Sequence, residues 1–117
     1  MICILGFYRR HPELSPTEFS RYWREVRGPL IRDTPAVARH IARYTHHHLP
    51  DVSESWLSGV SPLGFDGFYE TWFADGDAFR AMLAEPDFRG IVHADAGRFV
   101  DLRATRVIVR DDPVAMI

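Results

Sequence analysis

Three consecutive histidines, His46, His47 and His48, are the most unusual chemical feature of this sequence. They end segment 40–49 (HIARYTHHHL), which predicts a β-strand with His46 and His48 on one face and His47 on the other. Two imidazoles on one face of a strand lie about 7 Å apart, too far to share a metal ion unless the strand bends or ends there. The run is therefore open to three interpretations: a solvated strand end, an acid–base site, or a metal site completed by a third ligand.

Two charged residues, Arg27 and Glu70, occupy positions in predicted elements where the role of the charge must be explained. Arg27 closes a predicted helix, where it is either a solvated cation that favours the helix dipole or an anchor for an enolate, phenolate or carboxylate. Glu70 stands inside segment 67–74, an otherwise apolar predicted strand. Because a buried carboxylate must be paired or stay protonated, Glu70 either forms an ion pair with Arg43 or a helix arginine, or is a neutral acid.

Aromatic residues make up 13% of the chain. Any single ring is more simply explained as part of the core, but together they favour an apolar, ring-lined cavity between helices and sheet. Such a cavity suits a flat hydrophobic molecule. The residues that we expect to bind it are Tyr8, Phe19, Tyr22, Trp23, Tyr44, Glu70 and Trp72.

The most strongly patterned element is the helix that carries Arg27. Ser15 and Glu18 form a capping-box pair, and Pro16 occupies the first helical position. Apolar residues then recur at helical spacing at Phe19, Tyr22, Trp23, Val26 and Leu30. Gly28 and Pro29 interrupt the pattern and predict that the helix ends there.

A second helix is predicted to start at Asp75 or Asp77, and further helical turns follow over 87–99. On those turns we expect His93 and Asp95 to face solvent. Residues 50–65 have the composition of a long loop, which in a small domain is typical of a functional loop or lid. The segments that predict strands are 2–8, 40–49, 67–74 and 104–110.

The order β-α-β-β-α-β predicts a single α+β domain over 1–117 with the ferredoxin-like fold. Its four-stranded antiparallel sheet has the first and third strands in the centre and both helices on one face. The first and third predicted strands are apolar in both alternation phases, as central strands are. The other face would expose a large apolar patch, so we expect a homodimer with the two sheets face to face.

Composition and motifs argue against nucleic-acid-binding proteins, membrane proteins and nucleotide-dependent enzymes. A formal net charge of −2, with both signs interspersed, gives no field for nucleic acid or an anionic membrane, and no apolar run approaches the roughly 18 residues of a membrane span. Cys3 is the only cysteine, which suits a reducing, cytoplasmic setting. No glycine-rich phosphate loop joins a predicted strand to a helix, so a nucleotide cofactor is not expected.

The helical motif F-x-x-Y-W-x-x-x-x-G-P-L, from Phe19 to Leu30, resembles that of the EthD family of dimeric α+β barrels. The resemblance implies the ferredoxin-like dimer and a small-molecule enzyme without an organic cofactor. It points to oxidoreductase, dehydratase or cyclase chemistry in the degradation of small organics or in polyketide and aromatic metabolism. Weaker matches extend it over nearly the whole chain, at Arg43, Tyr44, His48, Asp66, Gly67, Glu70, Trp72, Phe73, Phe99 and Asp101.

One position departs from the family's pattern. Relatives usually have a histidine immediately before Gly-Pro-Leu, where this chain has Arg27. A guanidinium stays protonated at any useful pH, so Arg27 cannot replace that histidine as an acid–base group. His48 keeps the family's residue type.

The leading hypothesis is therefore a cofactor-independent enzyme acting on a hydrophobic, oxygenated aromatic or polyketide-like substrate by dehydration, cyclisation or oxidation. Arg27 would hold a developing oxyanion, and His48 or His46 would move a proton, in a site without a metal ion. Two alternatives stay open: a non-catalytic module that binds a hydrophobic metabolite, and a haem- or metal-binding relative that uses the histidines.

Overall fold

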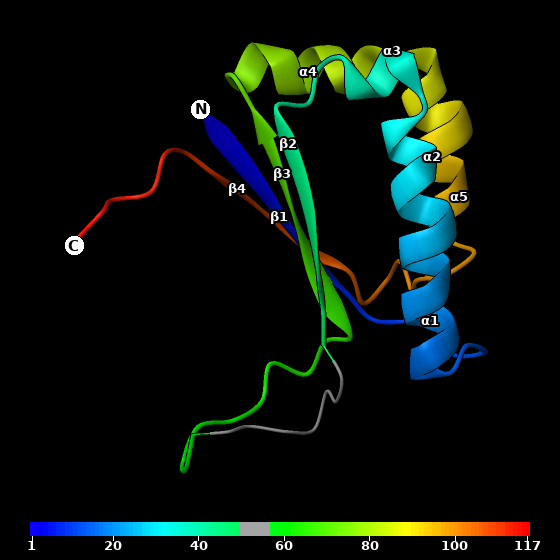
Figure 1. Ribbon diagram of the computed structural model, residues 1–117, viewed down its shortest axis with the longest axis vertical. Helices are drawn as coiled ribbons and strands as arrows, with labels where there is room; N and C mark the ends of the chain where they lie inside the picture. The colour runs from blue at the N-terminus through cyan, green and yellow to red at the C-terminus, as the bar shows by residue number, and fades with distance from the viewer. Residues whose placement is uncertain (50–56) are drawn as a thin grey trace.

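The computed structural model describes residues 1–49 and 57–117 and contains an antiparallel sheet with helices on one face (Figure 1). This confirms the predicted ferredoxin-like fold, with the first and third strands in the centre. Part of the predicted loop 50–65 lies outside the described residues. The strands are β1 (Ile2–Tyr8), β2 (Arg43–His48), β3 (Gly67–Phe73) and β4 (Arg106–Arg110), in the order β2-β3-β1-β4.

The predicted end of the first helix at Gly28 and Pro29 is wrong, because the helix continues through a π-helical stretch. The amide of Gly28 donates to the carbonyl of Trp23, and this wider turn accommodates the ring and the missing N–H of Pro29. The helical segments are α1 (Pro16–Tyr22), η1 (Trp23–Arg27), α2 (Gly28–Arg32), α3 (Pro35–Ala38), α4 (Gly76–Ala84), η2 (Phe88–His93) and α5 (Ala94–Ala96). Across the described ranges, these helices are too short or too polar to traverse a bilayer.

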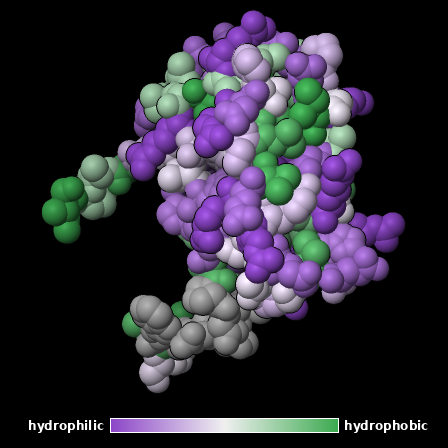
Figure 2. All heavy atoms as spheres, turned by 45° about the vertical axis from the view of Figure 1, so that its right-hand side comes forward, coloured by the Kyte–Doolittle hydropathy of each residue, from purple (hydrophilic) through white to green (hydrophobic). Residues whose placement is uncertain are grey.

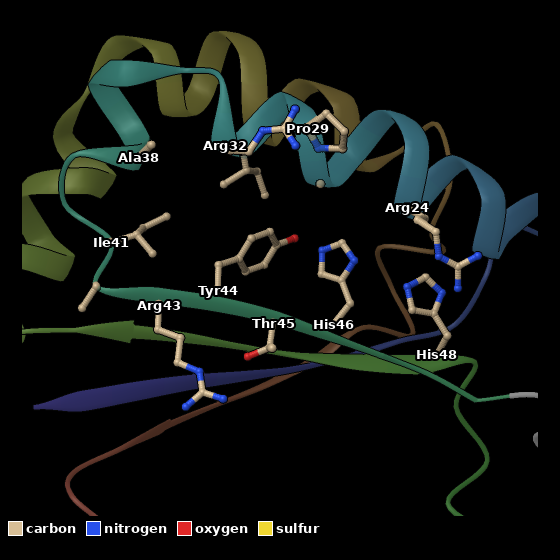
Figure 3. A pocket seen from close by; sticks show the side chains of 13 residues that line it. Arg24, Pro29, Arg32, Ala38, Ile41, Arg43, Tyr44, Thr45, His46 and His48 are labelled. Carbon is tan, nitrogen blue, oxygen red and sulfur yellow. The ribbon is translucent and has the colours of Figure 1, made fainter.

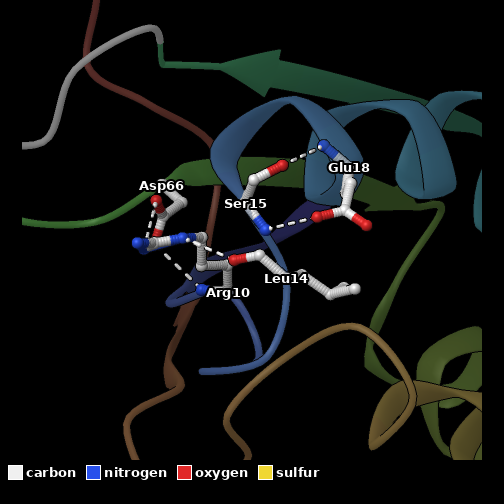
Figure 4. Close-up of polar contacts among 5 residues, drawn as sticks. All are labelled: Arg10, Leu14, Ser15, Glu18 and Asp66. Atoms are coloured by element: carbon white, nitrogen blue, oxygen red, sulfur yellow. Dashed lines mark hydrogen bonds and ion pairs between the residues drawn. The ribbon is translucent and has the colours of Figure 1, made fainter.

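Polar contacts tie the start of α1 to the sheet (Figure 4). The predicted capping box is present, with Glu18 N donating to Ser15 Oγ at 3.1 Å and Ser15 N donating to Glu18 Oε1 at 3.0 Å. Arg10 follows β1 and joins two neighbours: its amide donates to Asp66 Oδ2 at 2.9 Å, and its Nε donates to the carbonyl of Leu14 at 2.9 Å. The loop before α1 is therefore fastened to the residue that precedes β3.

Strand alternation gives the sheet two different faces. One face packs on the helices, and it carries the buried core residues Ile4, Tyr8 and Phe73. The surface over the helices is mostly hydrophilic, and the C-terminal residues extend away from the body (Figure 2). The face away from the helices carries the side chains of Leu5, Phe7, Arg43, Thr45, His47, Phe68, Glu70, Trp72 and Ile108, as the strand register requires.

On this open face Glu70 pairs with His47, whose Nε2 lies 2.7 Å from Glu70 Oε2. The expected ion pair of Glu70 with Arg43 or a helix arginine is therefore wrong. Antiparallel pairing places Glu70 opposite Thr45, which brings the neighbouring His47 of β2 within reach on the same face. The His47 ring also stacks on Phe68, with ring centroids 4.2 Å apart.

Close approach of Trp23 to the backbone of β3 requires a glycine at position 67. A Cβ atom on Gly67 would lie 2.4 Å from Trp23 Cζ3 and 2.7 Å from the carbonyl oxygen of His47. Trp23 is fully buried, so its ring has no free space to move into. Any side chain at Gly67 must therefore displace the ring or the edge strand.

We predict that Gly67→Ala lowers the free energy of unfolding by about 1–3 kcal/mol, the usual cost of overpacking a core. Urea denaturation followed by circular dichroism measures the change. Gly90→Ala is the matched control, because a Cβ atom there meets nothing within 4 Å. A loss at Gly67 no larger than at Gly90 would contradict the proposed packing constraint.

Candidate functional site

A cavity of about 270 Å³, partly open to solvent, lies between the sheet and the helices. We call it the inner cavity. Most of its wall is apolar, with residues such as Ile4 and Phe73 from the sheet and Met82 and Val92 from the helices. Its polar groups are few, as is typical of sites that hold hydrophobic ligands. They come from Tyr8, Arg27, Tyr44, Tyr69, Thr71, His93 and Thr105.

Arg27 reaches the inner cavity from η1 and is only 6% exposed. Its Nη1 donates to the carbonyl of Val92 and lies 3.5 Å from Asp95 Oδ2, while Asp95 Oδ1 accepts a hydrogen bond from the Tyr22 hydroxyl. The guanidinium also lies over the ring of Phe99, 5.6 Å from its centroid. The alternative of a solvated Arg27 is therefore excluded.

The expectation that Asp95 faces solvent is wrong. Asp95 is buried on α5 because the preceding π-helical stretch, η2, rotates the later residues relative to a regular helix. Its carboxylate compensates the buried charge of Arg27, and it connects Arg27 to Tyr22 of α1. The sequence offers no signal for this pairing beyond a carboxylate on an amphipathic segment.

Three tyrosines, Tyr8, Tyr44 and Tyr69, surround the cavity side of Arg27. Burial raises the pKa of each hydroxyl, and the nearby Arg27 cation offsets this only in part. All three therefore stay protonated and able to donate at ordinary pH. Among the described residues, the Tyr44 hydroxyl and Arg27 Nε are buried without a hydrogen-bond partner.

A second, more open hollow of about 700 Å³ runs along the edge strand β2 and faces α2 and α3. We call it the groove. Figure 3 shows Tyr44, His46 and His48 pointing from β2 into it, whereas Arg43 and Thr45 point to the other side of the strand. The groove and the inner cavity share Ile31, Ile41 and Tyr44, so the two spaces are adjacent.

The two groove histidines lie against the indole of Trp23. Ring centroids of His46 and His48 are each 4.4 Å from that of Trp23 and 5.5 Å from one another. His48 Nδ1 lies 2.7 Å from Ser20 Oγ of α1, and the His46 ring meets the edge of Tyr44 at 4.7 Å. The rings are thus closer than the regular strand spacing that the sequence analysis assumed.

Both groove histidines are neutral at pH 7. Burial lowers the pKa of His46 to about 4, with smaller contributions from His48, Arg27, Arg24 and His47. Burial also lowers the pKa of His48, again helped by Arg24. Each ring can therefore accept one proton or one hydrogen bond at physiological pH.

The predicted site residues fall into separate groups in the structure. Tyr8, Arg27 and Tyr44 line the inner cavity, and Tyr44 also lines the groove with His46 and His48. The other rings of the first helix line neither space: Phe19 and Trp23 are fully buried core, and Tyr22 holds Asp95. Glu70 and Trp72 lie on the opposite, open face of the sheet.

Sequence reasoning missed Tyr69, Arg24 and Ser20. Side chains alternate between the two faces of β3, so Tyr69 faces the helices while the adjacent Glu70 faces away from them. This alternation is the sequence signal that could have identified Tyr69. Its ring lies against Gly6 of β1, where a Cβ atom would approach it to 2.0 Å. Arg24 lies outside the apolar stripe of the predicted helix, where a charged residue is usually just solvated, yet it borders the groove. Within the described part of the chain, His, Cys, Asp and Glu side chains form no group of three that could hold a metal ion.

We predict that stability rises with pH between about 4 and 6.5 because His46 is harder to protonate in the folded state, where its pKa is about 4, than in the unfolded state, where it is near 6.5. His46→Gln should flatten this rise. Urea denaturation at pH 4.5 and 7.5 measures it, and His93→Gln, at an exposed position of η2, is the control. The same slope in wild type and His46→Gln would contradict the assigned burial of this ring.

The family model described as EthD domain matches residues 11–103. No curated protein sequence matches the chain. Among solved structures, an ethyl tert-butyl ether D (EthD) family protein from Bacillus halodurans C-125 superposes with a TM-score of 0.70 and 14% identity, over 97% of this chain and 99% of that one.

Two further structures share the fold at low identity. SnoaB, a cofactor-independent oxygenase from Streptomyces nogalater, has a TM-score of 0.60 and 19% identity, over 98% of this chain and 95% of its own. A dimeric protein of unknown function with a ferredoxin-like fold, from Bacteroides fragilis NCTC 9343, has a TM-score of 0.61 and 8% identity, over 95% of each chain. Together with the matched family model, which spans most of the sequence, these results identify the chain as a member of the EthD family.

Proposed function

We propose that this protein is a small-molecule enzyme that works without an organic cofactor on a hydrophobic, oxygenated aromatic or polyketide-like substrate. The observation that carries the proposal is the inner cavity, which Arg27 and Tyr44 line; Arg27 Nε and the Tyr44 hydroxyl are buried without a hydrogen-bond partner among the described residues. An unpaired buried donor costs about 1–3 kcal/mol. A ligand oxygen that accepts from these donors removes that cost, so an apolar molecule bearing oxygen is the ligand that fits. SnoaB, described as a cofactor-independent oxygenase, adds support from the same fold.

The proposed chemical step is removal of a proton from an acidic C–H or O–H bond of the substrate. The bond's electron pair stays on the substrate as an enolate or phenolate, and a groove histidine takes the proton. Arg27 keeps its positive charge and is held by Asp95 and Val92, so it can stabilise the oxyanion without rearranging. Tyr44 stays protonated and can donate to the same oxygen.

His46 is the first choice for the proton acceptor, and His48 is the second. His46 contacts the Tyr44 ring, which borders both the groove and the inner cavity. Its pKa of about 4 makes it a weak base in the free protein, but a developing anion nearby raises the pKa of a histidine toward the useful range. His48 is oriented by Ser20 and lies farther from Tyr44 along β2.

We predict that His46→Gln slows proton abstraction at least about 100-fold, the lower range for loss of a general base, and that His48→Gln has a smaller effect. The measurement is deuterium exchange at the acidic CH2 group of anthrone, followed by NMR in D2O. His11→Gln, in the loop between β1 and α1 and outside the lining of both the groove and the inner cavity, is the control. Unchanged exchange in both the His46 and the His48 variants would contradict the acid–base assignment.

The same assay separates the proposal from a non-catalytic binding module. Binding of anthrone can be followed separately by tryptophan fluorescence. If wild-type protein binds anthrone but exchanges no proton and forms no product from any aromatic or polyketide-like compound tested, the protein is a carrier for such molecules and the enzyme proposal fails.

We also propose that two copies pair through the open face of the sheet, as the uncovered apolar side chains there favour. The dimeric ferredoxin-like protein from Bacteroides fragilis supports such an assembly. Phe68, which packs between Phe7 and His47 on this face, would lie in the interface, as would Glu70 and Trp72. The sheet of the second copy would then cover the apolar side chains that the open face of one copy exposes.

We expect Phe68→Asp to convert the dimer to a monomer, because a buried unpaired charge is costly at an interface. Light scattering coupled to size exclusion measures the mass, and circular dichroism checks the fold. Val26→Asp is the control, because Val26 is an exposed apolar residue on the helical side. A wild-type monomer, or a Phe68→Asp dimer, would exclude this interface.

A further inference from the structure

We infer that the groove along β2 binds the carboxylate of an amphipathic organic acid, with Arg24 as its charged partner and the apolar body of the acid directed past Tyr44. This inference rests on the proposed function and narrows its substrate class. It concerns the groove rather than the inner cavity, where Arg27 is already paired with Asp95.

The charge of the groove is one-sided. Its lining contains the arginines Arg24, Arg32 and Arg43 and two histidines, and no aspartate or glutamate, although the whole chain has a formal net charge of −2. Arg32 is paired with Asp33 through two contacts of 2.8 Å. Arg43 points to the other side of β2 (Figure 3). Arg24 is therefore the arginine that directs an uncompensated charge at the groove.

The position of Arg24 suits a ligand that also contacts the histidines. Figure 3 shows its guanidinium beside His48 at one end of the groove. No ion pair of Arg24 is present among residues 1–49 and 57–117. Its charge acts on both histidines, because it contributes to lowering the pKa of His46 and of His48. A carboxylate here would pair with the guanidinium and accept N–H bonds from neutral imidazoles.

Apolar side chains line much of the rest of the groove, which is large enough for fused rings. Pro29, Ile31, Ala38 and Ile41 form the wall away from Arg24. The volume of about 700 Å³ falls within the usual range for small-molecule sites. Because Ile31, Ile41 and Tyr44 also border the inner cavity, a ligand anchored at Arg24 can extend toward Arg27.

The test compares 2-naphthoate with its neutral counterpart 2-naphthamide by isothermal titration calorimetry at low salt. We expect wild-type protein to bind 2-naphthoate about tenfold more tightly than the amide, since one charge-assisted contact distinguishes them. Arg24→Gln should remove this preference and leave the affinity for the amide unchanged. Arg21→Gln is the matched control, an exposed arginine of α1 outside the groove lining, and should keep the preference.

A second readout locates the anion. Bound 2-naphthoate should raise the pKa of His46, measured by NMR titration of its ring proton, because a negative charge favours the imidazolium and offsets Arg24, Arg27, His47 and His48. The inference is overturned if 2-naphthoate does not bind, if the amide binds equally well, or if Arg24→Gln keeps the preference. None of these outcomes depends on turnover, so they are separate from failure of the proton-exchange assay.

Discussion

The packing of Trp23 on the backbone of Gly67 is the constraint on which the rest of the structure depends. The indole occupies the space that a side chain at position 67 would take, and it is fully buried. The same ring supports His46 and His48 at 4.4 Å, so the helix, the central strand and the edge strand meet at one side chain. Burial of the histidines against this ring keeps them neutral, which connects core packing directly to the chemistry of the groove.

The buried charge of Arg27 sets a second constraint. A guanidinium in this position requires a compensating group, and Asp95 supplies it from a segment far along the chain. Two π-helical stretches, η1 and η2, lead to these two residues. Such stretches are frequent at functional sites, because the wider turn redirects side chains that a regular helix would place elsewhere. Arg27 is thus built into the fold as a fixed, permanent cation.

Strand alternation gives the sheet two faces with different residues, one under the helices and one open. On β2, the phase that contains Tyr44, His46 and His48 meets the helices, whereas His47 in the other phase joins Glu70 on the open face. The three consecutive histidines therefore lie in different environments although their side chains are identical: His46 and His48 line the groove, and His47 pairs with Glu70 on the open face. Sheet geometry thus places His46 and His48 on the side that the helices cover and His47 on the open side.

Much of the fold follows from local pattern. The Ser15–Glu18 capping box, a helix cap at Asp75 or Asp77, the apolar central strands and the β-α-β-β-α-β order all act within a few residues or through simple alternation, so the sequence alone predicted them; the structure chooses Asp75 as the cap. The same alternation separated His47 from its two neighbours. The sequence also contained the family motif around Trp23. It did not show that the Trp23 ring is buried and supports the two histidines instead of lining a cavity.

The partners of the charged groups were decided by tertiary structure alone. The pairing of Arg27 with Asp95 and of Glu70 with His47 depends on how π-helical stretches rotate a helix and on the register between strands, and neither is encoded in residue spacing. The low pKa of His46 likewise depends on burial against Trp23 and on the positions of Arg24 and Arg27. The sequence by itself therefore determined the strands, the capped starts of two helices and the order of these elements. Burial and long-range contact determined the environment of the charged and titratable side chains, because electrostatic environment is a property of the packed chain.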